Sequence, residues 1–251
     1  MEGRPATRAT STAAFQRLSL GAIPGFAAGF TRGPLTARSL DPDAAGRALA
    51  AVLGAPDAEV VMLNQVHGAR VLTFEEPARK RRNFLLGDGD ALLTSQPNVL
   101  LAVASADCVP IVLADPVSGW IAAVHAGWRG TATRVVDAAL DALAARGVRL
   151  GDLFAAFGPS ISRDRYEVGP EVVAALLDAY GASPGGAIAP GAGGKAFLDV
   201  AAFNGAALHA RGVRPERIAA AGLCTAGTPD LPSWRRDGPG AGRILTGIVR
   251  R

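Results

Sequence analysis

The sequence contains few of the side chains that bind metals or form disulfides. Of its 251 residues, only two are cysteine, three are histidine and two are methionine. The two cysteines lie far apart in the chain and do not make a disulfide framework, which favours a reducing compartment. Any metal site must therefore draw on a very small set of residues.

Long apolar segments are also absent. No run reaches the length of a membrane span, and the first twenty residues lack the apolar core of a secretory signal. The formal net charge of +4 is mild, and no basic helix with interleaved aromatic residues favours a nucleic-acid partner. We expect a cytoplasmic protein that binds neither membranes nor nucleic acids, with an irregular segment over residues 1–21.

The pattern of the remaining chain mixes strands and helices. Hydrophobic residues make up 49% of the sequence, which is ample for a packed core. There is neither a G-x-G-x-x-G motif nor a regular βαβ repeat, and no linker rich enough to divide the chain. Residues 22–251 are therefore predicted to form a single domain of the α+β or irregular α/β class.

Hydrophobic periodicity places the individual elements. Apolar runs predict strands at 59–63, 70–74, 99–104, 109–114, 120–124, 153–157, 217–223 and 243–249. Helices are predicted over 41–53, from Thr131 to Gly147, over 170–180, and from Asp199 to Ala210. The stretch 182–195, with its Gly and Ala residues, is predicted to be a surface loop.

Residues 104–130 carry the clearest chemistry. Cys108 begins one predicted strand and His125 ends the next, so antiparallel pairing would bring both to the same end of a sheet. His67 follows another strand-like run. Two histidines and one cysteine suit zinc with an open fourth position, and copper accepts the same ligands. The alternative is structural: a hydrogen-bonded histidine at a strand end and an inert buried cysteine.

Short motifs occur in a fixed order around these residues. They are NQVHG at 64–68, GDGDALLT at 87–94, ADCVP at 106–110, VHAGWRG at 124–130, GPSI at 158–161, YEVGPEV at 166–172 and SWRRDGPGAGR at 233–243. Over residues 58–249 this set resembles the YfiH/laccase-domain family, whose members are also labelled polyphenol oxidase or purine nucleoside phosphorylase.

The resemblance implies a layered α/β/β/α sandwich and a zinc ion held by His67, Cys108 and His125. It also implies phosphorolysis of purine nucleosides (adenosine, inosine, guanosine and methylthioadenosine), so the expected partners are these nucleosides and phosphate. Adenosine deamination is a second activity that we expect as an alternative, since zinc-bound hydroxide can attack C6 of adenine.

Five further roles are expected from the matched motifs. Asp90 is either a turn residue or a carboxylate beside the metal, acting as a proton acceptor or supporting a ligand. Arg129, flanked by glycines, is a candidate for phosphate contact, with a structural salt bridge as the alternative. Arg32, Gln65 and Arg235 are candidates for substrate contact.

Three other function classes compete with the phosphorylase. A multicopper laccase needs a blue-copper centre and a histidine-rich cluster, which three histidines cannot supply, although copper at the His/Cys site would permit weak phenol oxidation. A metal-free hydrolase would use Cys108 as nucleophile and His125 as base. The third class is a non-enzymatic interaction protein.

Overall fold

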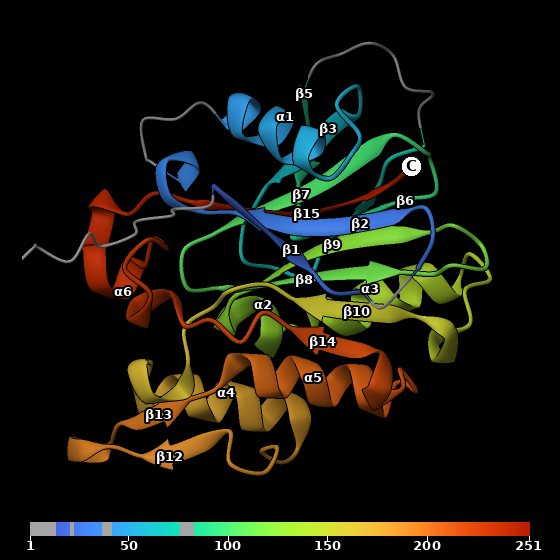
Figure 1. Ribbon diagram of the computed structural model, residues 1–251. Helices are drawn as coiled ribbons and strands as arrows, with labels where there is room; N and C mark the ends of the chain where they lie inside the picture. Colours follow the sequence, from blue (N-terminus) through green and yellow to red (C-terminus); the bar gives the residue numbers. More distant parts are fainter. Residues whose placement is uncertain (1–13, 21–22, 37–41, 76–82) are drawn as a thin grey trace, which may run out of the picture.

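Two stacked six-stranded sheets form the centre of the computed structural model, which describes residues 14–20, 23–36, 42–75 and 83–251 (Figure 1). The first sheet has the spatial order β1 (Phe15–Leu18), β2 (Phe26–Thr31), β15 (Ile244–Arg250), β7 (Val99–Ser105), β3 (Glu59–Asn64) and β5 (Asn83–Asp88). Within it, β3 pairs in parallel with β5 and β7, and the other pairs are antiparallel.

The second sheet carries the hairpin singled out by the sequence. Its order is β14 (Ile218–Ala220), β10 (Phe154–Phe157), β8 (Val109–Ala114), β9 (Ile121–Ala126), β6 (Ala91–Thr94) and β4 (Val71–Thr73). A small third sheet contains β11 (Glu167–Val168), β13 (Ala196–Leu198) and β12 (Ile188–Pro190).

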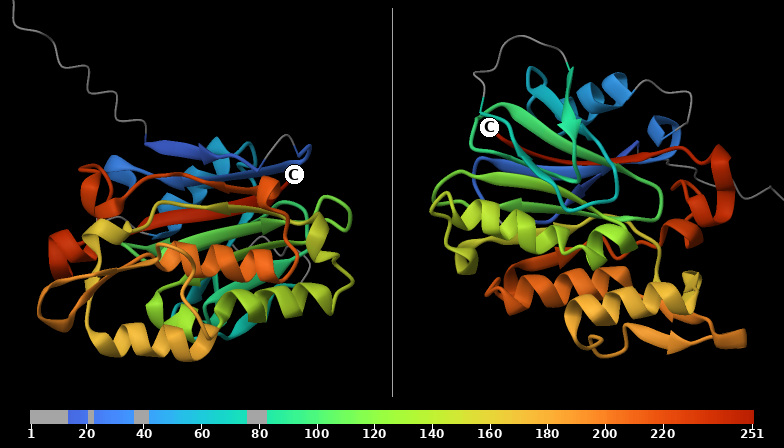
Figure 2. Two further views of the ribbon diagram at one scale, coloured as in Figure 1. Left: turned by 90° about the horizontal axis from the view of Figure 1, so that it is seen from below. Right: turned by 180° about the vertical axis from the view of Figure 1, so that it is seen from behind.

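Helices cover the outer faces of both large sheets (Figures 1 and 2). Helix α1 (Pro42–Val52) packs on the first sheet. The second sheet is covered by a helical layer in which α3 (Val135–Ala144) contacts the strands directly and α5 (Val200–Ala210) lies beside α3, whereas α4 (Pro170–Tyr180) packs on the small third sheet. The short helix α2 (Trp128–Ala132) follows β9 in the chain. The short helix α6 (Trp234–Asp237) comes before β15. This arrangement confirms the predicted α/β/β/α sandwich.

Burial on both faces explains why β8 and β9 are continuously apolar. In β8, Ile111 and Leu113 pack with the helix layer, whereas Val112 packs between the sheets. In β9, Val124 faces the helices and Ala123 faces the other sheet. A strand with two buried faces loses the polar–apolar alternation of a half-exposed strand, because both sets of side chains leave water.

The β8–β9 hairpin fixes the end of the sheet at which the candidate ligands lie. The strands are antiparallel, and Pro110 pairs with His125. Cys108, which precedes β8 by one residue, therefore lies at the same end as His125, as the sequence predicts. At the opposite end the Asp115 carboxylate accepts hydrogen bonds from the backbone N–H groups of Val117 and Ser118, which closes the turn.

Three expected elements differ from the structure. The helix predicted to begin at Thr131 is divided into α2 and α3, because Arg134 adopts a left-handed conformation with φ +63°. The stretch 182–195 is not entirely a loop, since β12 pairs with β13. Residues 15–18, within the segment expected to be irregular, form β1. Residues 1–13, 21 and 41, which also belong to predicted segments, lie outside the described residues.

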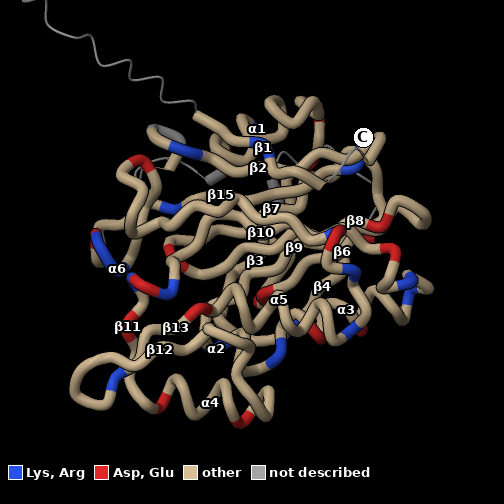
Figure 3. The backbone as a smooth tube through the Cα atoms, turned by 60° about the horizontal axis from the view of Figure 1, so that its bottom comes forward, with Lys and Arg blue, Asp and Glu red and all other residues tan. Residues whose placement is uncertain are grey.

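The described helices are all too short or too polar to cross a membrane. Figure 3 marks charged residues of both signs along the backbone tube, including adjacent basic and acidic positions in α6. Helix α6 begins at the capping residue Ser233, whose side chain accepts a hydrogen bond from the backbone N–H of Arg236. This capping fixes a four-residue helix that is too short to be stable alone.

The layer between the two sheets predicts a clear stability difference between two leucines. Leu101 in β7 is 0% exposed between the sheets, whereas Leu85 in β5 is 64% exposed. We expect Leu101→Ala to lower the free energy of unfolding by about 2–5 kcal/mol, because it leaves a cavity. The matched Leu85→Ala change should cost less than about 0.5 kcal/mol. Equal losses in chemical denaturation would contradict the assigned layers.

Candidate metal centre

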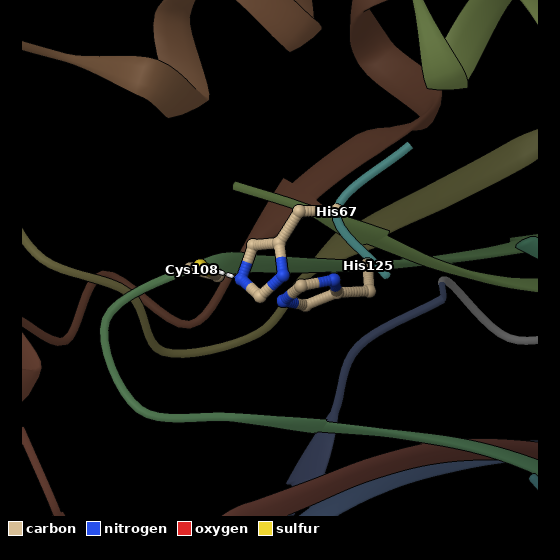
Figure 4. Close-up of side chains that lie close together, drawn as sticks. All are labelled: His67, Cys108 and His125. Atoms are coloured by element: carbon tan, nitrogen blue, oxygen red, sulfur yellow. Dashed lines mark hydrogen bonds between the residues drawn. The ribbon is translucent and has the colours of Figure 1, made fainter. Parts of the chain in front are cut away.

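His67, Cys108 and His125 converge from three separate segments. His67 lies in the loop after β3, Cys108 lies between β7 and β8, and His125 lies in β9. Their ligand atoms all lie within 4.8 Å of one another. The Cys108 Sγ atom is 4.0 Å from His67 Nε2, and the two imidazole centroids are 4.9 Å apart and nearly perpendicular (Figure 4).

The donor set and its shape fit a zinc ion. Zinc bonds of about 2.0–2.1 Å to nitrogen and about 2.3 Å to sulfur place tetrahedral ligand atoms about 3.4–3.6 Å apart. The observed separations need only small side-chain rotations to reach these values. Gly127 keeps the space open, since a Cβ there would lie 2.8 Å from Cys108 Sγ and 3.2 Å from His67 Cδ2.

One buried carboxylate, that of Asp90, orients both histidines. Its Oδ1 accepts hydrogen bonds from His125 Nδ1 at 2.9 Å and from the His67 backbone N–H at 3.0 Å. Its Oδ2 accepts from the backbone N–H groups of Gly68 at 2.7 Å and Val66 at 3.3 Å. Burial raises the pKa of this carboxyl, but these donors hold it below its usual range. Asp90 therefore leaves His125 Nε2 available to a metal.

Left-handed backbone occurs on both sides of the ligand group. His67 has φ +62° and Asp107 has φ +91°, two of four such non-glycine residues in the described chain. Conformations of this kind cost about 1–3 kcal/mol each and persist where the surroundings enforce them. The buried Asp107 carboxylate accepts hydrogen bonds from the Thr225 hydroxyl at 2.5 Å and the Arg235 backbone N–H at 2.7 Å. Asp107 thus fixes the Cys108 turn, the role that its position next to the ligand suggests, and ties it to α6.

The electrostatics favour a thiolate. Burial alone would raise the pKa of Cys108, but hydrogen bonds from His125 and His67 lower it to about 7. Burial lowers the pKa of His125, yet its bonds to Asp90 and Cys108 raise it to about 9. The thiolate is the form of cysteine that binds metals and acts as a nucleophile.

A pocket of about 590 Å³ opens beside the three ligands. Its volume lies within the usual range for small-molecule sites. Besides the ligands, its lining includes Gln65, Asp107, Trp128, Arg129, Tyr166, Trp234, Arg235 and Arg243. The pocket therefore combines aromatic surfaces with several guanidinium groups next to the candidate metal position.

The candidates for substrate contact fall into two groups. Arg129 and Arg235 line the pocket, and Arg129 forms no ion pair with any described residue. Gln65 also lines the pocket, but its amide group binds the backbone N–H and carbonyl of Ala104. This side chain supports the adjoining strand β7.

Arg32 lies apart from this pocket. It is not among the pocket-lining residues, and its guanidinium binds both carboxylate oxygens of Asp230 at 2.9 Å. A third hydrogen bond joins it to Gln16 Oε1 at 2.6 Å. The structure therefore gives Arg32 a structural ion pair in place of the expected substrate contact. Its partner Asp230 is 198 residues away in sequence, which no local pattern reveals.

Aromatic side chains form part of the pocket wall, and no local pattern in the sequence predicts them. Tyr166 and Trp234 belong to two of the matched motifs, YEVGPEV and SWRRDGPGAGR. Their spacing in the sequence does not predict that they line the pocket. Trp234 is 51% exposed and lines the mouth of the pocket together with Tyr166. Asp90, in turn, is fully buried and does not line the pocket, and its carboxylate contacts His125 and the backbone of His67.

Comparison with known proteins places the chain in a family. The family model described as multi-copper polyphenol oxidoreductase laccase matches residues 43–251. The chain belongs to this laccase family. Its relatives include a purine nucleoside phosphorylase from Deinococcus radiodurans, 38% identical over 235 residues, with 90% of this chain and 87% of that protein covered.

Two further relatives of this laccase-family chain are informative. Adenosine deaminase RL5, from an unknown prokaryotic organism, is 38% identical over 208 residues, covering 81% of this chain and 79% of that protein. The crystal structure of YlmD from Geobacillus stearothermophilus matches with a TM-score of 0.79 at 29% identity, covering 91% of this chain and 93% of YlmD. Relatives of the laccase family thus carry names of two purine-nucleoside enzymes.

The role assigned to Asp90 predicts a defect in metal binding. Asp90→Asn removes the charge that holds His125 and weakens the bonds to three backbone N–H groups. We expect zinc to bind about 10–100-fold more weakly in chelator competition. Asp88→Asn is the matched control, because within the described part of the chain that exposed carboxylate binds only the Asn64 side chain. Unchanged affinity in Asp90→Asn would contradict the assignment.

Proposed function

We propose that this chain is a zinc-dependent purine nucleoside phosphorylase of the cytoplasm. Its substrates would be phosphate and the nucleosides adenosine, inosine, guanosine and methylthioadenosine. The observation that carries the proposal is the position of the His67–Cys108–His125 group beside a pocket lined by arginine and aromatic side chains. The name of the Deinococcus radiodurans relative supports the same reaction.

The pocket offers the groups that phosphorolysis requires. Phosphate must be held in line with the anomeric carbon of the sugar, because the reaction depends on positioning two substrates. Arg129 is exposed to the pocket, and its planar guanidinium matches two phosphate oxygens. It also lies 4.4 Å over the Trp128 ring, which restricts its orientation. Trp128 and Trp234 present apolar surfaces against which a purine can pack.

The metal ligands would hold the zinc ion at the edge of this pocket. When bound with an open fourth position, zinc supplies a Lewis acid and a hydroxide at neutral pH. Asp90 keeps the His125 ring oriented by accepting its Nδ1–H group, and the left-handed backbone of His67 directs the second ring. These residues act before any substrate arrives, so the geometry is fixed in advance.

Adenosine deamination is the second candidate reaction. One relative is named adenosine deaminase, at 38% identity. Attack of a water-derived hydroxide on C6 of adenine needs no phosphate, so the two reactions differ in their cosubstrate. Adenine with a sugar phosphate is the product of phosphorolysis, whereas inosine is the product of deamination.

Two other chemistries fit the site less well. A metal-free hydrolase gains some support from the Asp90–His125–Cys108 line, because an oriented base beside a thiolate is the arrangement of a cysteine nucleophile. It gives no role to His67, which also converges on the sulfur. A multicopper oxidase needs more metal ligands than a chain with three histidines can supply, despite the description of the family.

A single experiment tests the proposal. Protein purified without a metal-binding tag is analysed for zinc and copper and then assayed with adenosine, with and without phosphate, by product chromatography. We expect about one zinc per chain and adenine release that depends on phosphate. His125→Ala should lose the zinc and more than about a hundredfold in rate, since weakening a ligand's support alone costs 10–100-fold.

The third histidine provides the control for this experiment. His209 is exposed near the end of α5, so His209→Ala should keep both zinc and activity. In the same assay Arg129→Ala should weaken the dependence of the rate on phosphate. Full activity in His125→Ala, or in metal-free protein, would overturn the zinc proposal. Inosine formed without phosphate would assign deamination as the main reaction.

A further inference from the structure

Tyr166 is a pocket residue to which the proposed reaction assigns no role so far. It follows a short turn before β11, and its ring lines the pocket beside the metal group. Within the described part of the chain its hydroxyl has no hydrogen-bond partner, although its backbone N–H and carbonyl are both bonded. The O–H group of a tyrosine in the wall of a pocket can therefore donate a hydrogen bond to a bound ligand.

Two arginines act on this phenol. The Arg235 guanidinium lies 4.9 Å over the Tyr166 ring. Burial and the Cys108 thiolate raise the pKa of Tyr166 to about 12, while the charges of Arg235 and Arg129 oppose the rise. The hydroxyl is therefore within the field of both guanidinium groups and stays protonated, as a donor, across the neutral pH range.

Arg235 is held in place but keeps its charge unpaired. Its backbone N–H donates to Asp107, and its Nη1 donates to the carbonyl of Glu167, the neighbour of Tyr166. Neither Arg235 nor Arg129 forms an ion pair with a described residue. The adjacent Arg236 shows the contrast, because it binds Asp237 and three backbone carbonyls and is used for structure.

We propose that Tyr166, Arg129 and Arg235 together form the phosphate-binding site of this pocket, with the Tyr166 hydroxyl donating a hydrogen bond to a phosphate oxygen. The inference rests on the proposed phosphorylase function and extends it. Two guanidinium groups balance the charge of a phosphate dianion, and a neutral donor completes its coordination without adding charge. Tyr166 is thus a residue that selects phosphate as the cosubstrate, and deamination does not need it.

The two tyrosines of the chain provide a matched test. Tyr166→Phe removes one oxygen and keeps the ring under Arg235. Tyr180→Phe is the control, because Tyr180 also lies beneath an arginine, Arg134 at 4.3 Å, but packs on Phe203 in α5 and does not line the pocket. We expect Tyr166→Phe to raise the KM for phosphate about 10–100-fold, the usual effect of losing a hydrogen bond to a charged group.

Other parameters separate a phosphate role from a general defect. In Tyr166→Phe the KM for adenosine and the rate of any phosphate-independent inosine formation should stay within about twofold, and Tyr180→Phe should match the unsubstituted protein in every parameter. An unchanged KM for phosphate in Tyr166→Phe would overturn the proposal. So would an equal rise in Tyr180→Phe, since that would indicate a change in folding.

Direct binding distinguishes this inference from the proposed function. Calorimetric titration of the zinc-loaded protein with inorganic phosphate needs no turnover. A dissociation constant raised about 10–100-fold in Tyr166→Phe supports the site even if the protein releases no adenine, in which case only the phosphorylase proposal fails. Absence of phosphate binding to the unsubstituted protein, or equal binding by both, overturns the phosphate site.

Discussion

The buried carboxylate of Asp90 binds two of the three candidate metal ligands at once, through the ring of His125 and the backbone of His67. The backbone carbonyl of Asp90 also accepts a hydrogen bond from the His125 N–H at 2.7 Å. Asp90 thereby joins the loop that follows β3 of the first sheet to strand β9 of the second sheet. Without this carboxylate, the buried imidazole of His125 and three half-buried backbone N–H groups would lose their acceptor, which is costly.

The sandwich explains why this arrangement can be rigid. Both faces of the β8–β9 hairpin are packed, against the other sheet and against the helices, so the ends of its strands cannot shift independently. The site lies at the ends of those strands. The rigid surroundings there hold His67 and Asp107 in left-handed backbone conformations. Asp107 then links the ligand turn to α6, which carries Trp234 and Arg235 into the pocket. The candidate metal ligands and the pocket-lining residues of α6 are therefore parts of one connected structure.

The sequence predicted those parts of the fold and of the candidate site that depend on short stretches of the chain. Continuous apolar runs gave β8 and β9 nearly to the residue, and the strand ends together with the motifs gave the ligand group. Features that depend on distant contacts were not predictable. The left-handed Arg134 divides a helix whose apolar stripe is continuous, β12 forms only because β13 lies beside it, and Arg32 turns to Asp230. The position of Tyr166 in the pocket depends on tertiary contacts, such as the hydrogen bond from the Leu198 N–H to its carbonyl, and no periodicity in the sequence indicates it.

The proposed activity depends on a single zinc ion at His67, Cys108 and His125 that supports phosphorolysis of purine nucleosides. Stepwise addition of zinc to metal-free protein, with phosphate-dependent adenine release measured at each step, tests it most directly. The rate should rise in proportion to zinc and stop rising at about one equivalent per chain, as expected for one three-ligand site. Full activity before any zinc is added, or a rate that keeps rising well beyond one equivalent, would contradict the claim.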